Sequence, residues 1–179
     1  MRNTLADVVT AALGVLDAQG LEGCSMRRVA AALDVQPSAL YHHVPNKQSL
    51  LALMADEIVG RVGRLHDARA LCIALRDAML RVRDGADVVA TAEAFRLGSS
   101  EIERSLAEMV GADGARTLLL FTFGHAQSTQ THRQAAQFGA LLDAPPAGGQ
   151  APPVFDLDAS FGRGLDIILR GLVPDADTR

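Results

Sequence analysis

The chain has little of what several common classes of protein require. Only two of its 179 residues are cysteine, and neither Cys24 nor Cys72 has a partner at the spacing of a zinc site or a redox motif. Tryptophan is absent and aromatic residues make up 4% of the chain. The start MRNTLADVV lacks the small-residue cleavage site of a signal peptide, and no apolar run is long enough to span a membrane. We therefore expect a cytoplasmic location and no membrane partner.

An excess of basic charge is also missing. The chain has 17 Lys and Arg against 21 Asp and Glu, a net charge of −4 that argues against indiscriminate binding to nucleic acid. The charge is uneven, because residues 1–66 are neutral and residues 67–179 carry the whole deficit. Residues 24–47 contain three cations, Arg27, Arg28 and Lys47, and one acid, Asp34. This segment is the one locally basic region.

What the sequence does have is a 49% apolar content, rich in alanine and leucine at helical spacing. That composition favours helix packing, so the predicted fold class is all-α, with about nine to ten helices. We predict a head at 1–46 and a body at 47–179, with 47–65 as a connecting helix. Further helices are expected at 67–83, 86–96, 100–110, 113–141 and 156–172. The segment APPAGGQAPP, 144–153, predicts a mobile loop.

The head contains strong signals for helix ends. Apolar residues from Leu5 onward predict a first helix that ends at Gly20 in a left-handed cap. Ser25 is suited to cap a short second helix, Pro37 to begin a third that ends near His43, and Asn46 to cap a fourth. Two short helices joined by a tight turn describe a helix-turn-helix, in which the second helix enters the major groove of DNA.

The side chains of this segment have the chemistry that DNA contacts need. Arginine pairs with phosphate or guanine, amide, hydroxyl and imidazole groups reach base edges, and small apolar groups touch the thymine methyl. The predicted DNA-binding residues are Arg27, Gln36, Pro37, Ser38, Ala39, Tyr41, His42, His43 and Lys47. A metal site at His42 and His43 is not expected, because adjacent positions on a helix diverge by about 100° and no Cys or carboxylate follows at i+3 or i+4.

The run SMRRVAAALDVQPSALYHHVPNKQSLL, with its Leu-Tyr-x-His-Val and the following Asn-Lys, resembles the DNA-binding head of the tetracycline-repressor (TetR) family of bacterial regulators. The resemblance continues more weakly through RDGA at 83–86, FGH at 123–125 and GLDIILRGL at 164–172. It implies a nucleoid-associated homodimer that binds double-stranded operator DNA with its heads and a small-molecule effector in its bodies. His42 stands where the family often has a larger aromatic residue, so the operator sequence does not carry over.

The family's response to tetracycline does not carry over either. The resemblance places Val89 and Arg133 at two positions that reach the drug-bound magnesium in tetracycline repressors, and Gly63 where a histidine touches the drug. We therefore expect an effector other than magnesium–tetracycline. No cofactor and no metal are expected.

The body has a central helix whose polar residues face either a cavity or a partner subunit. His125 and His132 lie two turns apart on one face of that helix. The predicted ligand-binding residues are Phe95, Phe121, His125, Thr129, His132 and Arg133. The alternative is that one histidine is a core or dimer-interface residue and the other is solvated. Two rival functions remain. One is an enzyme that uses His125 or His132 as a base, and the other is an interaction module without DNA binding. We expect no enzymatic activity, because no nucleophile is paired with either histidine in recognisable form.

Overall fold

The computed structural model describes residues 3–95, 100–138 and 156–172, and these form eight helices and no strand. The predicted all-α class is therefore confirmed. The predicted mobile loop at 144–153 lies outside the described residues. The helices are α1 (Leu5–Gly23), α2 (Met26–Ala32), α3 (Pro37–Tyr41), α4 (Lys47–Val59), α5 (Ala68–Leu80), α6 (Gly85–Ala94), α7 (Ser100–Gln137) and α8 (Leu157–Gly171).

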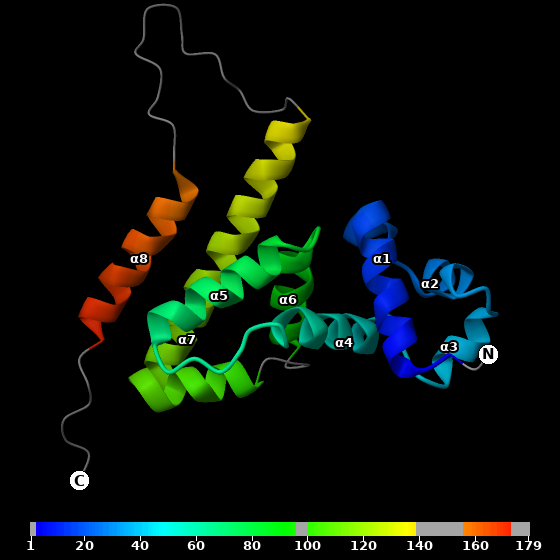
Figure 1. Ribbon diagram of the computed structural model, residues 1–179, viewed down its shortest axis with the longest axis horizontal. Coiled ribbons are helices and arrows are strands. Elements are labelled where there is room, and N and C mark those ends of the chain that lie inside the picture. Colours follow the sequence, from blue (N-terminus) through cyan, green and yellow to red (C-terminus); the bar gives the residue numbers. More distant parts are fainter. Residues whose placement is uncertain (1–2, 96–99, 139–155, 173–179) are drawn as a thin grey trace, which may run out of the picture.

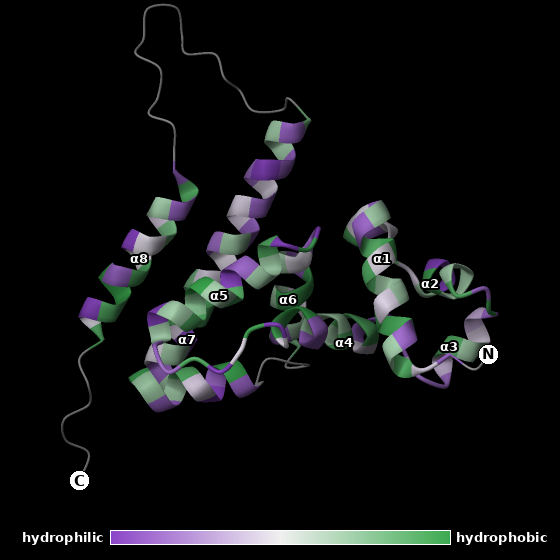
Figure 2. Cartoon of the chain, in the orientation of Figure 1, coloured by the Kyte–Doolittle hydropathy of each residue, from purple (hydrophilic) through white to green (hydrophobic). Residues whose placement is uncertain are grey.

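The helices form a small head of α1 to α3 and a larger body of α5 to α8, with α4 reaching from one to the other (Figure 1). α4 packs on α1 in the head and makes its most extensive contact with α6 in the body. Its Met54 and Ile58 side chains are fully buried, and α6 is mostly hydrophobic along its length (Figure 2). Head and body therefore share one continuous apolar core.

The helix starts follow the local signals. Ser25 and Asn46 cap α2 and α4 as predicted, and their side-chain oxygens accept the backbone N–H of Arg28 and of Ser49 at 3.4 and 2.8 Å. Pro37 occupies the first turn of α3. Three further side chains cap helices in the same way: Thr4, Asp67 and Asp156.

The helix bounds differ from prediction at several places: α4 ends at Val59 rather than 65, α5 ends at Leu80 rather than 83, and two glycines account for further differences. Gly20 does not end α1 in a left-handed cap: its φ of 71° and ψ of 176° fall in a region open almost only to glycine, and a last helical turn follows to Gly23. Gly111, with φ 76° and ψ 165°, breaks α7 at the predicted place, yet helix continues on both sides. Because the helices predicted at 100–110 and 113–141 are one element with a kink at Gly111, the described residues hold eight helices rather than nine or ten.

Both cysteines are buried in this core and unpaired. Burial raises the pKa of the Cys72 thiol to about 11 and also raises that of Cys24. Thiols held protonated in this way act as small apolar groups rather than as nucleophiles. None of the described helices has the length and apolar character of a membrane span.

Candidate DNA-binding surface and body cavities

The turn between α2 and α3 is fixed by backbone hydrogen bonds. The N–H of Val35 donates to the carbonyl of Ala30 at 3.0 Å, and the N–H of Asp34 donates to that of Ala31 at 3.1 Å. This pair of bonds is a Schellman motif, which needs a left-handed residue after the helix. Asp34 supplies it with φ 54°, although glycine would adopt that conformation with less strain. The turn thereby sets the direction in which α3 leaves α2.

α3 is held by its inner face and leaves its outer face free. Leu40 is 1% exposed and Val44 is fully buried, so the two anchor this segment in the core of the head. All nine predicted DNA-binding residues lie at least partly on the surface. Arg27, Gln36, Ser38, Ala39, Tyr41, His42 and His43 are exposed, and Pro37 and Lys47 are half-buried.

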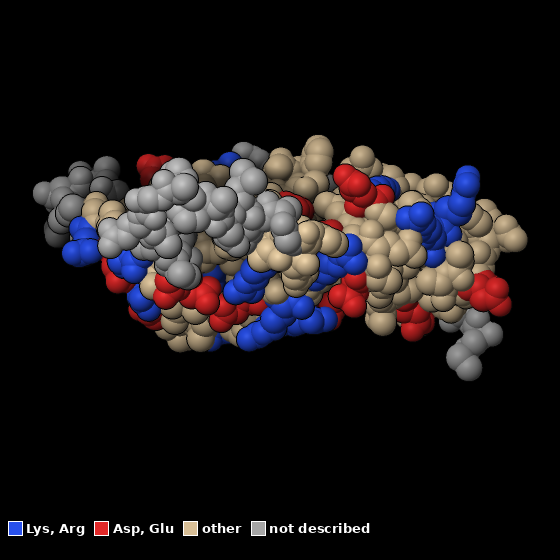
Figure 3. All heavy atoms as spheres, turned by 90° about the horizontal axis from the view of Figure 1, so that it is seen from above, with Lys and Arg blue, Asp and Glu red and all other residues tan. Residues whose placement is uncertain are grey.

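The two arginines of α2 have different environments. Arg28 donates to the carbonyl of Gly23 at 2.8 Å and so helps to close the end of α1. Arg27 is exposed and has no hydrogen-bonding partner among the described residues. Lys and Arg side chains gather on the head in the view from above (Figure 3). The arrangement leaves Arg27 available for a phosphate or a base edge.

In the body, three of the six predicted ligand-binding residues come together on α7. Phe121 stacks on Phe161 of α8 with ring centroids 5.4 Å apart, and the His125 ring lies 5.0 Å from that of Phe161. Gly164 permits this close packing, because a methyl group there would overlap the Phe121 ring. The hydroxyl of Thr129 is fully buried, lies 3.2 Å from Nδ1 of His125 and donates to the His125 carbonyl.

The cluster is completed by a buried arginine that the sequence did not single out. Arg76 of α5 is 4% exposed, and its guanidinium lies 4.9 Å from the centre of the Phe161 ring. Its Nη2 donates to Thr129 at 3.3 Å and to the carboxylate of Asp158 at 2.7 Å. This hydrogen bond from Arg76 holds the pKa of Asp158 below its usual value, while burial and Arg76 lower the pKa of His125.

The other three predicted ligand-binding residues lie apart or at the margin. Arg133 reaches the cluster only through Asp158, at 3.7 Å. His132 is exposed, and Phe95 is 60% exposed at the end of α6. The residues of this cluster that the sequence did not single out are Arg76, Asp158 and Phe161. For Arg76 a signal existed, since it falls at helical spacing among the apolar residues of α5, where an arginine needs a partner.

Residues of the body also form hydrogen bonds with the kinked end of α1. The break at Gly20 leaves carbonyls of α1 without helical donors, and Arg83 donates to those of Asp17 and Ala18 at 2.9 and 3.2 Å. Asp84 accepts the backbone N–H of Leu21 at 2.7 Å. A Cβ at position 20 would stand 2.9 Å from the Asp84 carboxylate, so glycine suits this contact as well as the dihedral angles.

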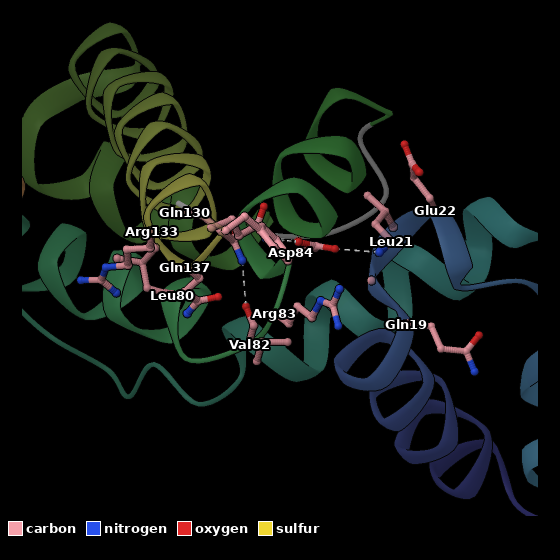
Figure 4. A pocket seen from close by; sticks show the side chains of 13 residues that line it. Gln19, Leu21, Glu22, Leu80, Val82, Arg83, Asp84, Gln130, Arg133 and Gln137 are labelled. Atoms are coloured by element: carbon pink, nitrogen blue, oxygen red, sulfur yellow. Dashed lines mark hydrogen bonds between the residues drawn. The ribbon is translucent and has the colours of Figure 1, made fainter. Parts of the chain in front are cut away.

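Glutamines of α7 hold the turn that carries Arg83 and Asp84. Gln130 donates to the carbonyl of Val82 at 3.1 Å and accepts the N–H of Ala86 at 3.0 Å. Gln134 donates to the second carboxylate oxygen of Asp84. A cavity of about 490 Å³ opens at this junction, between α1 and α7 (Figure 4). The turn thus connects the central helix of the body to the first helix of the head.

Known proteins resemble both parts of the chain. Residues 8–54 match the family described as bacterial regulatory proteins, tetR family. The HTH-type transcriptional repressor DrrR1 of Streptomyces coeruleorubidus is 54% identical over 55 residues, which cover 31% of this chain but only 20% of that relative. The tetracycline repressor protein class D of Escherichia coli is 29% identical over 92% of this chain and 86% of its own length.

Solved structures extend the likeness to the whole architecture. Mycobacterium smegmatis BioQ superposes with a TM-score of 0.84 at 31% identity, covering 95% of this chain and 97% of that one. BioQ with its double-stranded DNA operator gives 0.77 at 30% identity over 95% and 98% of the two chains. Streptomyces coelicolor ActR in complex with (S)-DNPA gives 0.72 at 27% identity over 96% and 98%. With the helix-turn-helix in the head and this agreement over the body, the chain belongs to the TetR family of DNA-binding transcriptional regulators.

Proposed function

We propose that the protein is a ligand-responsive transcriptional repressor that binds a palindromic operator as a homodimer. The observation that carries the proposal is the outer face of α3, where Ser38, Tyr41 and His42 are exposed on a helix anchored by Leu40. A helix of this kind reads base edges while neighbouring cations bind phosphates. Relatives named as repressors, and BioQ solved on its operator, support the same use of the head.

We propose that α7 and α8 form the homodimer interface. Leu120 on α7 is 61% exposed and Ile167 on α8 is 66% exposed, which leaves apolar surface on both helices. A dimer would cover that surface and place two heads about 34 Å apart, the spacing of successive major-groove half-sites. Sedimentation should then show a dimer for the unchanged protein and a monomer for Ile167→Glu. A monomeric unchanged protein would contradict this.

We propose that a small molecule bound in the body releases the DNA and that this molecule is not magnesium–tetracycline. Val89 is fully buried among apolar residues of α6, and neither it nor Arg133 offers a magnesium ligand. ActR, solved with (S)-DNPA, is a neighbour with a small molecule bound. A ligand could act through α4, which contacts both α1 and α6, by changing the separation of the two heads.

A non-enzymatic role fits the surroundings of His125. The hydroxyl of Thr129 lies within hydrogen-bonding distance of its ring, and this hydroxyl already donates to the His125 carbonyl and accepts from Arg76. That hydroxyl is fully buried and satisfied, so it is a poor nucleophile for His125 to activate.

The experiment is selection of a binding sequence from random DNA, followed by titration of that DNA at several salt concentrations. We expect a palindromic sequence bound with strong salt dependence. Ser38→Ala should relax the base preference at one position of each half-site, by about 1–3 kcal/mol for the hydrogen bond to a base that it removes. Failure to select any sequence, or binding that is independent of salt, would overturn the proposal.

A further inference from the structure

A second cavity, of about 420 Å³, lies between α5, α7 and α8, and it is cationic in a chain of net negative charge. Its charged lining residues are Arg69, Arg76, Arg81, Arg133, Asp77 and Asp158. Arg69 is paired with Asp166 outside the lining, at 2.9 Å. Even with Asp166 counted, the arginines outnumber the acids. The volume is that of a small-molecule site, and the charge favours an anion.

Arg76 is the buried cation of this cavity, and its hydrogen bonding is incomplete. It is 4% exposed, and among the described residues its guanidinium bonds through one nitrogen, Nη2, which donates to Asp158 and Thr129. Its Nε is buried and has no hydrogen-bond partner among the described residues. A buried charged donor without a partner is costly, and a carboxylate that engages two nitrogens of an arginine relieves that cost.

Asp158 contacts two of these arginines through a single, solvent-exposed carboxylate. One oxygen contacts Arg76 at 2.7 Å and lies 3.7 Å from Arg133, while its side chain remains 69% exposed in the first turn of α8. Because the guanidinium of Arg76 is buried, its charge needs an anionic partner, and a carboxylate that engages two of its nitrogens can exchange with the exposed Asp158 carboxylate, which engages one. Asp158 therefore occupies the position of an anionic ligand.

The apolar part of the cavity defines the rest of the ligand. Phe161 lines it with a flat ring, and Ile73 and Leu80 of α5 add aliphatic surface. We propose that this cavity binds an organic carboxylate with a flat apolar body, whose carboxylate replaces Asp158 on Arg76 and Arg133. The inference rests on the proposed function, for which it names the class of effector. Because Asp158 belongs to α8, ligand binding frees the start of a helix that the proposed dimer uses.

The test uses 2-naphthoate as the probe and the uncharged 2-naphthamide as its control, titrated calorimetrically into the full chain. We expect saturable binding of 2-naphthoate and binding of the amide at least about tenfold weaker, the effect of losing one charge-assisted bond of about 1.4 kcal/mol. Asp158→Asn should tighten 2-naphthoate binding by about threefold or more, because it removes the competing anion. Arg133→Gln should weaken it by a similar factor.

Arg163→Gln is the matched control, since Arg163 is exposed on α8 and does not line the cavity. Opposite effects at positions 158 and 133, with none at 163, support the site without relying on a change at the buried Arg76. Absence of binding to both the unchanged protein and Asp158→Asn overturns it. So does binding that neither substitution alters.

The same preparations are then titrated with the selected DNA. If they bind DNA but not 2-naphthoate, the anion site is wrong and the proposed repressor stands. If they bind 2-naphthoate with the expected variant pattern but not DNA, the anion site stands and the repressor is wrong. Release of the DNA by 2-naphthoate, and not by 2-naphthamide, would support both.

Discussion

The carboxylate of Asp84 accepts the backbone N–H of Leu21 at 2.7 Å and so joins the body to the head across 63 positions of the chain. Asp84 does this from a left-handed conformation, φ 54° and ψ 18°, which costs a residue other than glycine about 1–2 kcal/mol. Its other oxygen is held by Gln134. The residue is therefore placed by its partners against its own backbone preference.

Two substitutions separate these contributions. Asp84→Ala removes both hydrogen bonds and keeps the backbone strain, so the free energy of unfolding should fall by about 2–3 kcal/mol. Asp84→Gly removes the same bonds and relieves the strain, so it should cost about 1 kcal/mol less. Urea unfolding measures both. Asp113→Ala, at an exposed position of α7, is the control; an equal effect there would show that the Asp84 contacts contribute nothing.

The turn of the helix-turn-helix offers a substitution that should stabilise the protein. Asp34 is exposed and left-handed, and its side chain makes no hydrogen bond to a described residue. Asp34→Gly should raise the free energy of unfolding by about 0.5–1 kcal/mol. The relief of backbone strain in the folded protein exceeds the stabilisation of the unfolded chain by the greater freedom of glycine. Asp34→Ala keeps the strain and should give no gain. A loss of stability in the glycine variant would mean that the Asp34 side chain has a role not seen in its contacts.

Arg27 should contribute to DNA binding through charge alone if its partner is a phosphate. Arg27→Gln would then weaken binding to all sequences alike and reduce the slope of log K against log salt by about 0.9 for each phosphate that Arg27 neutralises. Titrations of selected and unrelated DNA at several salt concentrations give the slopes. Arg104→Gln, exposed in the body, should leave them unchanged. A changed base preference with an unchanged slope would assign Arg27 to guanine instead.

His125 should make stability depend on pH in a defined direction. Burial and Arg76 lower its pKa in the folded protein from the ordinary value of 6.5. Between the two pKa values the unfolded chain binds more protons, so the free energy of unfolding rises with pH up to about 6.5 and levels off above it. Urea unfolding from about pH 5 to 8 should show this rise. His125→Gln should remove it, whereas His132→Gln, at an exposed position of the same helix, should not.

Local signals in the sequence account for much of the head. Ser25, Pro37 and Asn46 begin helices where predicted, because capping and proline geometry depend on a few neighbouring residues. The residues on the outward face of α3 could be predicted from the same local signals. Gly20 was misjudged because its conformation is set by a turn 63 positions away, which no pattern around residue 20 records.

In the body, contacts between different helices could be predicted from the sequence even less than in the head. Phe121, His125 and Thr129 share one face of α7, so helical periodicity sufficed to group them. Arg76 and Asp158 join them from α5 and α8, separated by 82 positions, and their pairing depends on how the helices pack. Periodicity within one helix carries no information on which helix lies opposite.

The contact between Arg83, Asp84 and the end of α1 also limits how the protein can be divided or recombined. A fragment that ends after α4 would leave carbonyls of α1 without the donors that Arg83 provides, and would expose the N–H of Leu21. A chimaera with the head of a relative would need a residue at position 84 that fits the imported helix. Engineering new specificity into this regulator therefore starts from replacing side chains on α3, with the whole chain kept intact.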